Sequence, residues 1–252
     1  MIKIKNERQI EGIRASCALL SSLYDELAPM IRPGVTPLDL DEHARAFIER
    51  HGGRPAFLGY EGYPATLCIS VNEVVIHGIP NSRPFAEGDI VGIDCGIDLD
   101  GYYSDAAFTL PVGEISADAK DLLRVTKECL DLAIRTIQPG IRISDISRAV
   151  FSHAVRHGYG VVRQYCGHGV GLEIHEDPQI PNYVSPGPNP RLMPGMVLAI
   201  EPMINLGTGD VRVLDDGWTV VTMDRSLSAH YEHTVLVTKN GCEVLTRWNA
   251  GL

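Results

Sequence analysis

Gly88-Asp89-Ile90-Val91-Gly92-Ile93-Asp94 is a short strand-forming run that ends on an acid, and Gly195-Met196-Val197-Leu198-Ala199-Ile200-Glu201 has the same design 107 residues later. A carboxylate held inside a sheet is costly unless another group offsets its charge, and a cation does so best. The two runs therefore predict buried strands that bring Asp94 and Glu201 to a common metal site.

The segments that precede these runs also correspond, at an offset of 106 residues. The matches are Ile31-Arg32-Pro33-Gly34 with Ile137-Gln138-Pro139-Gly140, Asp39 with Asp145, and Arg50-His51-Gly52 with Arg156-His157-Gly158. The shared order of helix, turn, helix, strand and acid indicates an internal duplication. We expect one catalytic domain, 1–252, with two halves at roughly 1–112 and 113–252 whose equivalent strand ends meet near an approximate two-fold axis.

Helical spacing dominates the first third of the chain. The apolar positions with that spacing are Ile10, Ile13, Cys17, Leu20, Leu23 and Leu27. Thr36 and Pro37 are typical of an N-cap and a first helical turn, and Gly52 follows the end of the second helix. A further helix is expected over residues 117–137.

Composition excludes several classes of protein. The chain has 252 residues and a formal net charge of −10, which argues against a general nucleic-acid binder. No apolar run approaches the roughly 18 residues of a membrane helix, and the first residues lack the apolar core of a secretion signal. None of the six cysteines forms a C-x-x-C pair, so we expect free thiols in a reducing compartment, the cytoplasm.

Five side chains are candidate metal ligands: Asp94, Asp105, His168, Glu201 and Glu232. Four carboxylates and one imidazole suit a pair of divalent ions better than a single ion. Two metals about 3.5–4 Å apart are a recurring device for hydrolysis. The set therefore predicts a metallohydrolase.

A hairpin connects the first two of these ligands. Asp100-Gly101 is a strong signal for a two-residue turn, which would pair Leu99 with Tyr102 and Asp94 with Ala107. Asp105 then lies on the same face as Asp94, whereas a three-residue loop would shift the register. Two further acids, Asp98 and Asp100, are interpreted as solvated turn residues.

Histidines supply the remaining candidates. Glycines flank His168, which indicates close backbone approach, and His230 shares the predicted strand face of Glu232. His77 and His175 each join an apolar stretch to a Gly/Pro turn, where strand ends meet a cleft. His153 and His157 have a zinc-like i, i+4 spacing but lack the Glu of H-E-x-x-H, so we interpret them as surface or packing residues.

The segments that carry these residues resemble the type I methionine aminopeptidases of bacterial length. The resemblance covers nearly the whole chain and rests on Asn72 through Pro80, Asp94 through Asp105, Gly167 through Gly171, Pro194 through Pro202 and Ser226 through Thr234. It implies an α+β fold called pita-bread: a curved, mainly antiparallel sheet with helices on one side and internal pseudo-two-fold symmetry.

The resemblance also implies roles for individual residues. Asp94 would hold one metal, Asp105 and Glu232 would bridge both, and His168 and Glu201 would complete the other. The implied catalytic residues are His77, His175 and Glu201, and the implied methionine pocket contains Tyr60, Tyr63, Cys68 and Trp218. Two pocket positions depart from the pattern, because Phe57 and Ile174 stand where bacterial relatives often carry Cys and Phe.

The resemblance further implies removal of the N-terminal methionine from nascent polypeptides, with Co, Mn, Fe or Zn as the two ions. We expect a monomer without a membrane or a specific nucleic-acid partner, and the ribosome is a candidate partner. One alternative is an X-Pro aminopeptidase or prolidase of the same fold, which the segment Gly171 through Glu176 resembles. The other is a non-catalytic binding homologue.

Overall fold

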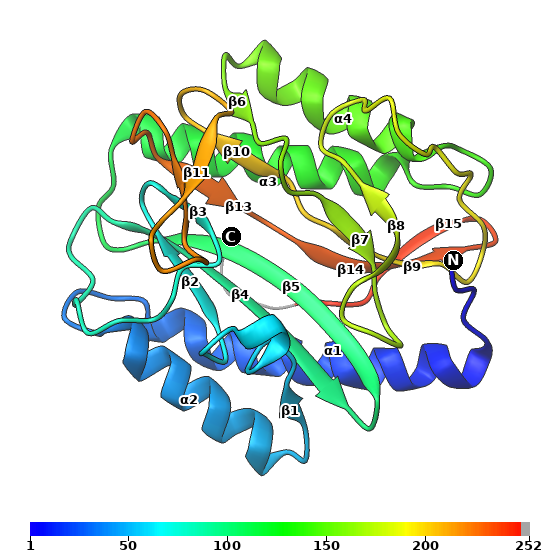
Figure 1. Ribbon diagram of the computed structural model, residues 1–252, viewed down its shortest axis with the longest axis horizontal. Helices are drawn as coiled ribbons and strands as arrows, with labels where there is room; N and C mark the ends of the chain where they lie inside the picture. The colour runs from blue at the N-terminus through cyan, green and yellow to red at the C-terminus, as the bar shows by residue number, and fades with distance from the viewer. Residues whose placement is uncertain (248–252) are drawn as a thin grey trace.

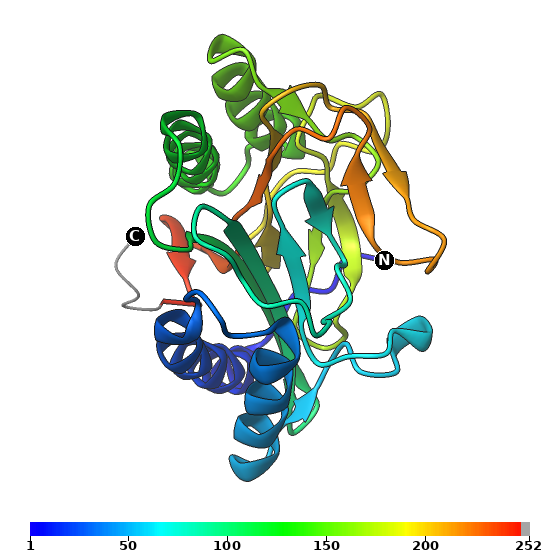
Figure 2. The same cartoon turned by 90° about the vertical axis from the view of Figure 1, so that its left-hand side faces the viewer.

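Two pairs of helices lie above and below the strands in Figure 1, and Figure 2 shows that both pairs are on the same side of the sheets. The computed structural model describes residues 1–247, and its long helices are α1 (Glu7–Leu27), α2 (Pro37–Arg50), α3 (Ala117–Thr136) and α4 (Ile143–Arg156). Short 3-10 turns occur at Ala28–Met30 and Tyr60–Gly62. The helices confirm those expected from the sequence, to within about a residue at each end of α2 and α3.

The second helices of the two pairs correspond in length and in position along the chain. Helices α2 and α4 have 14 residues each, and both ends of α4 lie 106 positions after those of α2. The backbone N–H of Thr36 donates to Asp39, and that of Arg142 donates to Asp145, each at the start of its helix. Equivalent residues therefore cap equivalent helices.

The strands are short except for one central hairpin. They are β1 (Arg54–Pro55), β2 (Cys68–Val71), β3 (Val74–Ile76), β4 (Ile90–Leu99), β5 (Tyr102–Pro111), β6 (Gly160–Val161), β7 (Gly167–Gly169), β8 (Glu176–Ile180), β9 (Val197–Ile200), β10 (Met203–Asn205), β11 (Val211–Val213), β12 (Val220–Thr222), β13 (Ser228–His230), β14 (His233–Thr238) and β15 (Gly241–Val244). Every ladder between them is antiparallel.

The β4–β5 hairpin has the predicted register. Leu99 pairs with Tyr102, and Asp94 pairs with Ala107. Asp100 and Gly101 form the two-residue turn with φ of 53° and 81°. Two consecutive positive φ angles match a type I′ turn, whose twist suits adjoining strands. The turn thus fixes the register that places Asp105 on the face of Asp94.

The second half contributes a five-stranded sheet in the order β15-β14-β9-β7-β8. Within it His168 pairs with Ala199, and His233 pairs with Ile200. An isolated bridge between Ala107 and Glu232 joins this sheet to the β4–β5 hairpin. The bridge lies where strands of both halves approach each other, which brings their acidic ends together.

Helix α1 covers the hairpin with its predicted apolar face. Ile13, Cys17 and Leu20 have no exposed surface, and the ring of Tyr24 meets that of Phe108 edge-on at 4.6 Å. All six cysteines are free thiols. No helix of the described part of the chain is both long and apolar enough to cross a membrane.

One turn residue differs from the prediction. Asp98 is not solvated: it is 5% exposed, forms an ion pair with Arg54 of β1, and accepts the backbone N–H of Gly101. Its partner Arg54 lies 44 positions earlier, so local spacing gave no sign of the pair. Asp100, in contrast, is exposed as expected.

Candidate active site

The five predicted metal ligands converge on one place. Ligand atoms of Asp94, Asp105 and Glu232 lie within 4.8 Å of one another, and so do those of His168, Glu201 and Glu232. The two groups share Glu232, and His168 Nε2 lies 3.6 Å from Asp105 Oδ2 and 3.4 Å from Glu201 Oε1. Side chains from distant parts of the chain therefore form a single cluster.

Backbone pairing positions each member of the cluster. Asp94 and Asp105 project from the same face of the β4–β5 hairpin, and Glu201 follows directly after β9. Glu232 is held by its bridge to Ala107. His168 Nδ1 lies 2.9 Å from the carbonyl oxygen of Gly169, which orients the ring so that Nε2 faces the acids.

The cluster is strongly acidic and largely withdrawn from water. Burial raises the pKa of Asp94 to about 7. Burial, followed by repulsion from neighbouring carboxylates, raises the pKa of Asp105, Glu201 and Glu232 well above the ordinary value. Burial lowers the pKa of the His168 imidazole to about 3, so this ring stays neutral and cannot compensate the charge.

Unpaired oxygen atoms show that the cluster fits a cation. Within residues 1–247, Asp94 Oδ1, Asp105 Oδ1 and Glu232 Oε1 are buried and have no hydrogen-bond partner. Buried polar atoms are nearly always satisfied, and unpaired carboxylate oxygens are especially costly. Carboxylate oxygens and a neutral imidazole nitrogen are ligands that divalent ions of the Mn-to-Zn series accept.

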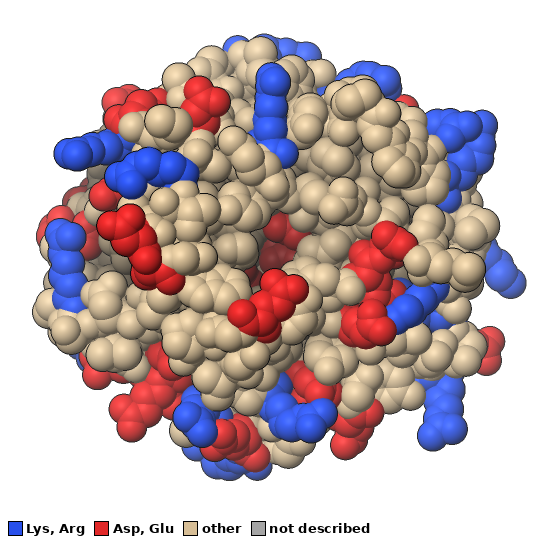
Figure 3. Space-filling view, in the orientation of Figure 1, with Lys and Arg blue, Asp and Glu red and all other residues tan. Residues whose placement is uncertain are grey.

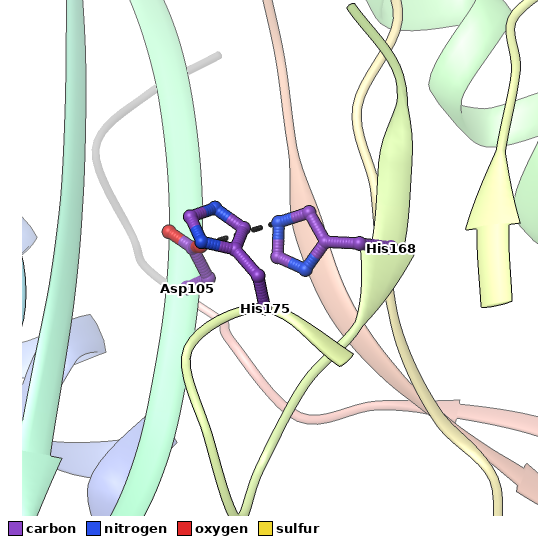
Figure 4. A group of neighbouring side chains, drawn as sticks. All are labelled: Asp105, His168 and His175. Carbon is purple, nitrogen blue, oxygen red and sulfur yellow. Dashed lines mark ion pairs between the residues drawn. The ribbon is translucent and has the colours of Figure 1, made fainter. Parts of the chain in front are cut away.

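The two predicted catalytic histidines line the same cavity as this cluster. The ring of His175 lies 4.4 Å from that of His168, and its Nδ1 is 3.0 Å from the hydroxyl of Tyr60. Asp105, His168 and His175 point toward a shared space from β5, β7 and the loop before β8 (Figure 4). His77 meets the ring of Tyr165 edge-on at 5.5 Å.

An apolar pocket adjoins the acids. Phe57, Tyr63, Cys68 and Ile174 form a buried cluster against which Trp218 packs, with the rings of Tyr63 and Trp218 5.1 Å apart. The cavity is lined by most of the predicted substrate residues, namely Phe57, Tyr60, Tyr63, Cys68, His77, His175 and Trp218, together with all five predicted metal ligands.

Ile174 is the one predicted pocket residue that does not line the cavity, because it is buried against Phe57. A Cβ on Gly96 would lie 2.9 Å from both Ile174 Cδ1 and Phe57 Cε1. Only a glycine at position 96 therefore lets these two side chains pack so closely on the hairpin.

The cavity opens on the face seen in Figure 3, where acidic side chains lie within the hollow and around it. Its volume is about 590 Å³. Glu61, Glu173 and Asp177 line it beside the buried acids. A negative cavity of this size attracts positively charged groups, both metal ions and amines.

Two residues of the site were not among the predicted functional residues. His230 Nε2 lies 3.8 Å from Glu201 Oε2 and is buried without a hydrogen-bond partner among residues 1–247. The signal in the sequence that could have identified His230 was strand alternation, which places it on the same face as Glu232. Tyr165 lines the cavity beside His77, and no sequence pattern pointed to it.

Comparisons with known proteins agree with this geometry. Residues 11–239 match metallopeptidase family M24. A methionine aminopeptidase of Treponema pallidum is 53% identical over 247 residues, which are 98% of this chain and 96% of that protein. The crystal structure of a methionine aminopeptidase from Rickettsia prowazekii superposes with a TM-score of 0.95 at 42% identity, covering 98% of this chain and 100% of that one.

The prolidases share the fold at lower similarity. A prolidase from Pyrococcus horikoshii gives a TM-score of 0.82 at 25% identity, and the match covers 99% of this chain but 65% of the prolidase. The matched proteins named methionine aminopeptidase are thus closer in sequence, structure and length. The chain belongs to metallopeptidase family M24 and, within it, to the methionine aminopeptidases.

Proposed function

We propose that this chain removes the N-terminal methionine of polypeptides by hydrolysis, using two divalent metal ions held by Asp94, Asp105, His168, Glu201 and Glu232. The observation that carries the proposal is the meeting of these ligands beside an apolar pocket. Asp94 would hold one ion, Asp105 and Glu232 would bridge, and His168 and Glu201 would hold the other. All five ligands are present, which disfavours a non-catalytic binding homologue.

A pair of divalent ions supplies Lewis acidity and lowers the pKa of water to near neutrality. The donor set accepts Mn, Fe, Co or Zn. The protein residues supply substrate orientation, proton transfer and selectivity for methionine. The six free thiols suit a reducing compartment, and we place the reaction in the cytoplasm.

The cavity favours a free chain terminus over an internal peptide bond. A terminal ammonium group is attracted by the acidic cluster and by Glu61, Glu173 and Asp177 at the cavity wall. An internal residue would bring no charge to this cavity. Binding of the amine therefore places the first peptide bond over the ligands and excludes later bonds.

His175 is positioned to stabilise the carbonyl oxygen as it gains negative charge. If the Tyr60 hydroxyl donates to Nδ1, 3.0 Å away, the proton of the neutral ring resides on Nε2. That N–H then donates to the developing oxyanion. Such a preorganised donor contributes about 2.7–4 kcal/mol to lowering the barrier.

Glu201 is the candidate for proton transfer. Its carboxylate has a raised pKa because it is buried near Asp105 and Asp94. A carboxylate whose pKa lies nearer neutrality can take the proton of the attacking water and deliver it to the leaving amine. His77, half-buried between the rings of Tyr165 and Trp218, would orient the peptide bond.

The apolar pocket fits a methionine side chain. Tyr63, Cys68 and Trp218 form a wall next to the metal ligands, and Phe57 closes the pocket. A flexible thioether makes favourable contacts with aromatic edges. The Tyr63 hydroxyl lies 2.9 Å from the carbonyl oxygen of Leu67 and 3.0 Å from that of Gly78, so this ring is fixed and offers its apolar body.

A peptide panel tests the proposal. The purified protein, loaded separately with Mn²⁺ or Co²⁺, is expected to release methionine from Met-Ala-Ser and to leave Ala-Pro-Ala intact. The reverse preference would assign the chain to the proline-specific peptidases. Absence of cleavage by protein that binds divalent ions would refute the catalytic assignment.

A further inference from the structure

Three metal-ligating side chains meet outside the catalytic cavity, on the paired helices α3 and α4. Glu128 of α3, together with His153 and His157 of α4, brings one ligand atom from each side chain within 4.8 Å of the others. His153 Nε2 lies 2.8 Å from Glu128 Oε2, and the rings of His153 and His157 are 4.8 Å apart. The proposed function uses none of these residues, and the position of Glu128 replaces the sequence-based interpretation of the two histidines as surface or packing residues.

The geometry is that of a chelating site. Histidines at i and i+4 lie on the same face of a helix, one above the other. Glu128 faces them from the neighbouring helix and is held in place because its Oε1 accepts a hydrogen bond from Arg124 Nη1 at 2.7 Å. The helices thus present a nearly formed set of two imidazoles and one carboxylate.

We propose that Glu128, His153 and His157 bind one zinc-class transition-metal ion, with water completing a tetrahedron. Two histidines and a glutamate with one open position form an established ligand combination for zinc. Arg124 pairs with both Asp121 and Glu128, so its positive charge is offset locally. The ion would join α3 to α4 and add one metal to those of the catalytic cluster.

Zinc binding to His157→Gln and to the parent protein tests this site. His157 is exposed, so its replacement leaves the fold intact. The parent is expected to bind one more Zn²⁺ per chain than H157Q in equilibrium dialysis, and to gain more thermal stability on adding Zn²⁺. Both proteins should cleave Met-Ala-Ser equally when loaded with Mn²⁺.

A matched control is His43, whose Nε2 lies 2.8 Å from Glu26 Oε2 in a comparable exposed pair without a second histidine. His43→Gln is expected to keep the zinc stoichiometry of the parent. Equal zinc stoichiometry for H157Q and the parent would overturn the proposal, as would an equal loss in H43Q and H157Q.

A buried ion pair lies next to the loop that ends at His175. Lys5 Nζ lies 2.7 Å from Glu176 Oε2, and the two side chains are 1% and 0% exposed. Glu176 Oε1 accepts the backbone N–H groups of Leu172 at 2.7 Å and Glu173 at 3.2 Å. One carboxylate therefore ties the N-terminal arm to the loop that ends at His175.

The backbone next to this lysine packs closely against α1. A Cβ on Gly171 would lie 2.4 Å from Ile13 Cδ1 and 3.4 Å from Lys5 Cε. The backbone N–H of Lys5 donates to the carbonyl of Gly195 at 2.9 Å. The N-terminal segment at Lys5 is thus fixed through both its backbone and its side chain, next to the loop that ends at His175.

We infer that Lys5 is a positioning residue for His175, acting through Glu176; this inference rests on the proposed function. Lys5 neutralises Glu176, and Glu176 holds the loop by two backbone hydrogen bonds. Without the ammonium group an unpaired buried carboxylate remains, which is strongly unfavourable. Rearrangement of the loop to expose it would displace the neighbouring imidazole.

Steady-state kinetics with Met-Ala-Ser test this role. Lys5→Met is expected to lower kcat by between about 10- and 100-fold, since a 1 Å misplacement of a catalytic group costs as much. KM and the number of catalytic ions should stay near those of the parent. The double variant Lys5→Met with Glu176→Gln keeps an acceptor for the loop without the unpaired charge, and it should recover much of kcat.

Lys3→Ala is the matched control, because Lys3 pairs with Glu173 at 2.9 Å near the surface of the same loop. K3A should retain the kcat of the parent. The inference is overturned if K5M keeps full kcat, or if K5M loses metal and activity together. A parent protein that leaves Met-Ala-Ser uncut would instead refute the proposed function.

Discussion

Single residues of the acidic cluster are held in an unfavourable state that a cation would relieve. Asp94, Asp105 and Glu232 each bury an oxygen that no donor satisfies in the described chain. Buried charges are strongly destabilising when unpaired. The cluster thus lowers the stability of the metal-free protein and raises its affinity for cations. Removing one of its acids should therefore lower activity but not the stability of the metal-free protein.

Asp94→Asn is expected to abolish turnover while the fold survives. The change removes a ligand charge, and losing about 4 kcal/mol of transition-state stabilisation lowers kcat/KM about 1000-fold. In the presence of a chelator, the variant should unfold at a temperature equal to or above that of the parent, because one buried acid is gone. Full activity in metal-supplemented buffer would contradict the ligand role.

His77 makes the protein sensitive to acid. Burial lowers the pKa of His77 to about 4, whereas in the unfolded chain it is near 6.5. A lowered pKa means that the unfolded state binds the proton first, so stability is full above pH 6.5 and falls as pH drops toward 4. The slope contributed by one such group is at most about 1.4 kcal/mol per pH unit.

His77→Asn should therefore flatten the pH dependence of unfolding by urea between pH 7 and pH 5. Asparagine tolerates the positive φ of 58° at this position, so the backbone is not strained by the change. Both proteins are compared with chelator present, which removes metal loss as a cause. Parallel stability curves for the two proteins would show that His77 is not buried as described.

At the level of elements, the β4–β5 hairpin could be predicted in register because its signals are local. Asp100-Gly101 defines the turn, and period-two alternation assigns the faces. The burial of Asp98 could not be predicted in the same way, because its partner Arg54 comes from a separate strand. Local chemistry therefore specified the ladder, while pairing across the sheet changed the environment of one residue.

Gly101→Ala tests the turn without touching the site. A Cβ at Gly101 meets no atom within 4 Å, so the only penalty is the left-handed backbone at φ of 81°, about 1–2 kcal/mol. We expect that loss in urea unfolding together with unchanged kcat. Gly167→Ala is the contrast, because its Cβ would lie 2.4 Å from the Ala199 carbonyl oxygen and would push β7, with His168, away from β9. Equal kinetics for these two variants would contradict the description of β7.

At the scale of the whole molecule, residues far apart in sequence meet in one cluster, as the predicted duplication would require. The 106-residue offset of α2 and α4 was readable in the sequence, and it implied that Asp94 and Glu201 are equivalent. The place of Tyr165 and the withdrawal of Ile174 from the cavity could not be predicted. Both depend on how loops pack around the strands, which no periodic pattern encodes.

Metal binding should stabilise the entire fold and depend on pH. At a concentration of free ion 100 times its dissociation constant, one site adds about 2.7 kcal/mol to the free energy of unfolding. The raised pKa of Asp94, about 7, and of its neighbours means that protons must leave before the ion binds. Thermal stabilisation by Mn²⁺ should therefore be larger at pH 8 than at pH 6, and a reversed order would contradict the carboxylate ligand set.

The most direct test is anomalous X-ray diffraction from crystals of the protein grown with Mn²⁺. We expect two adjacent anomalous peaks, one beside Asp94 and one beside His168 and Glu201, with Asp105 and Glu232 between them. A single peak in that cluster, or none, would contradict it.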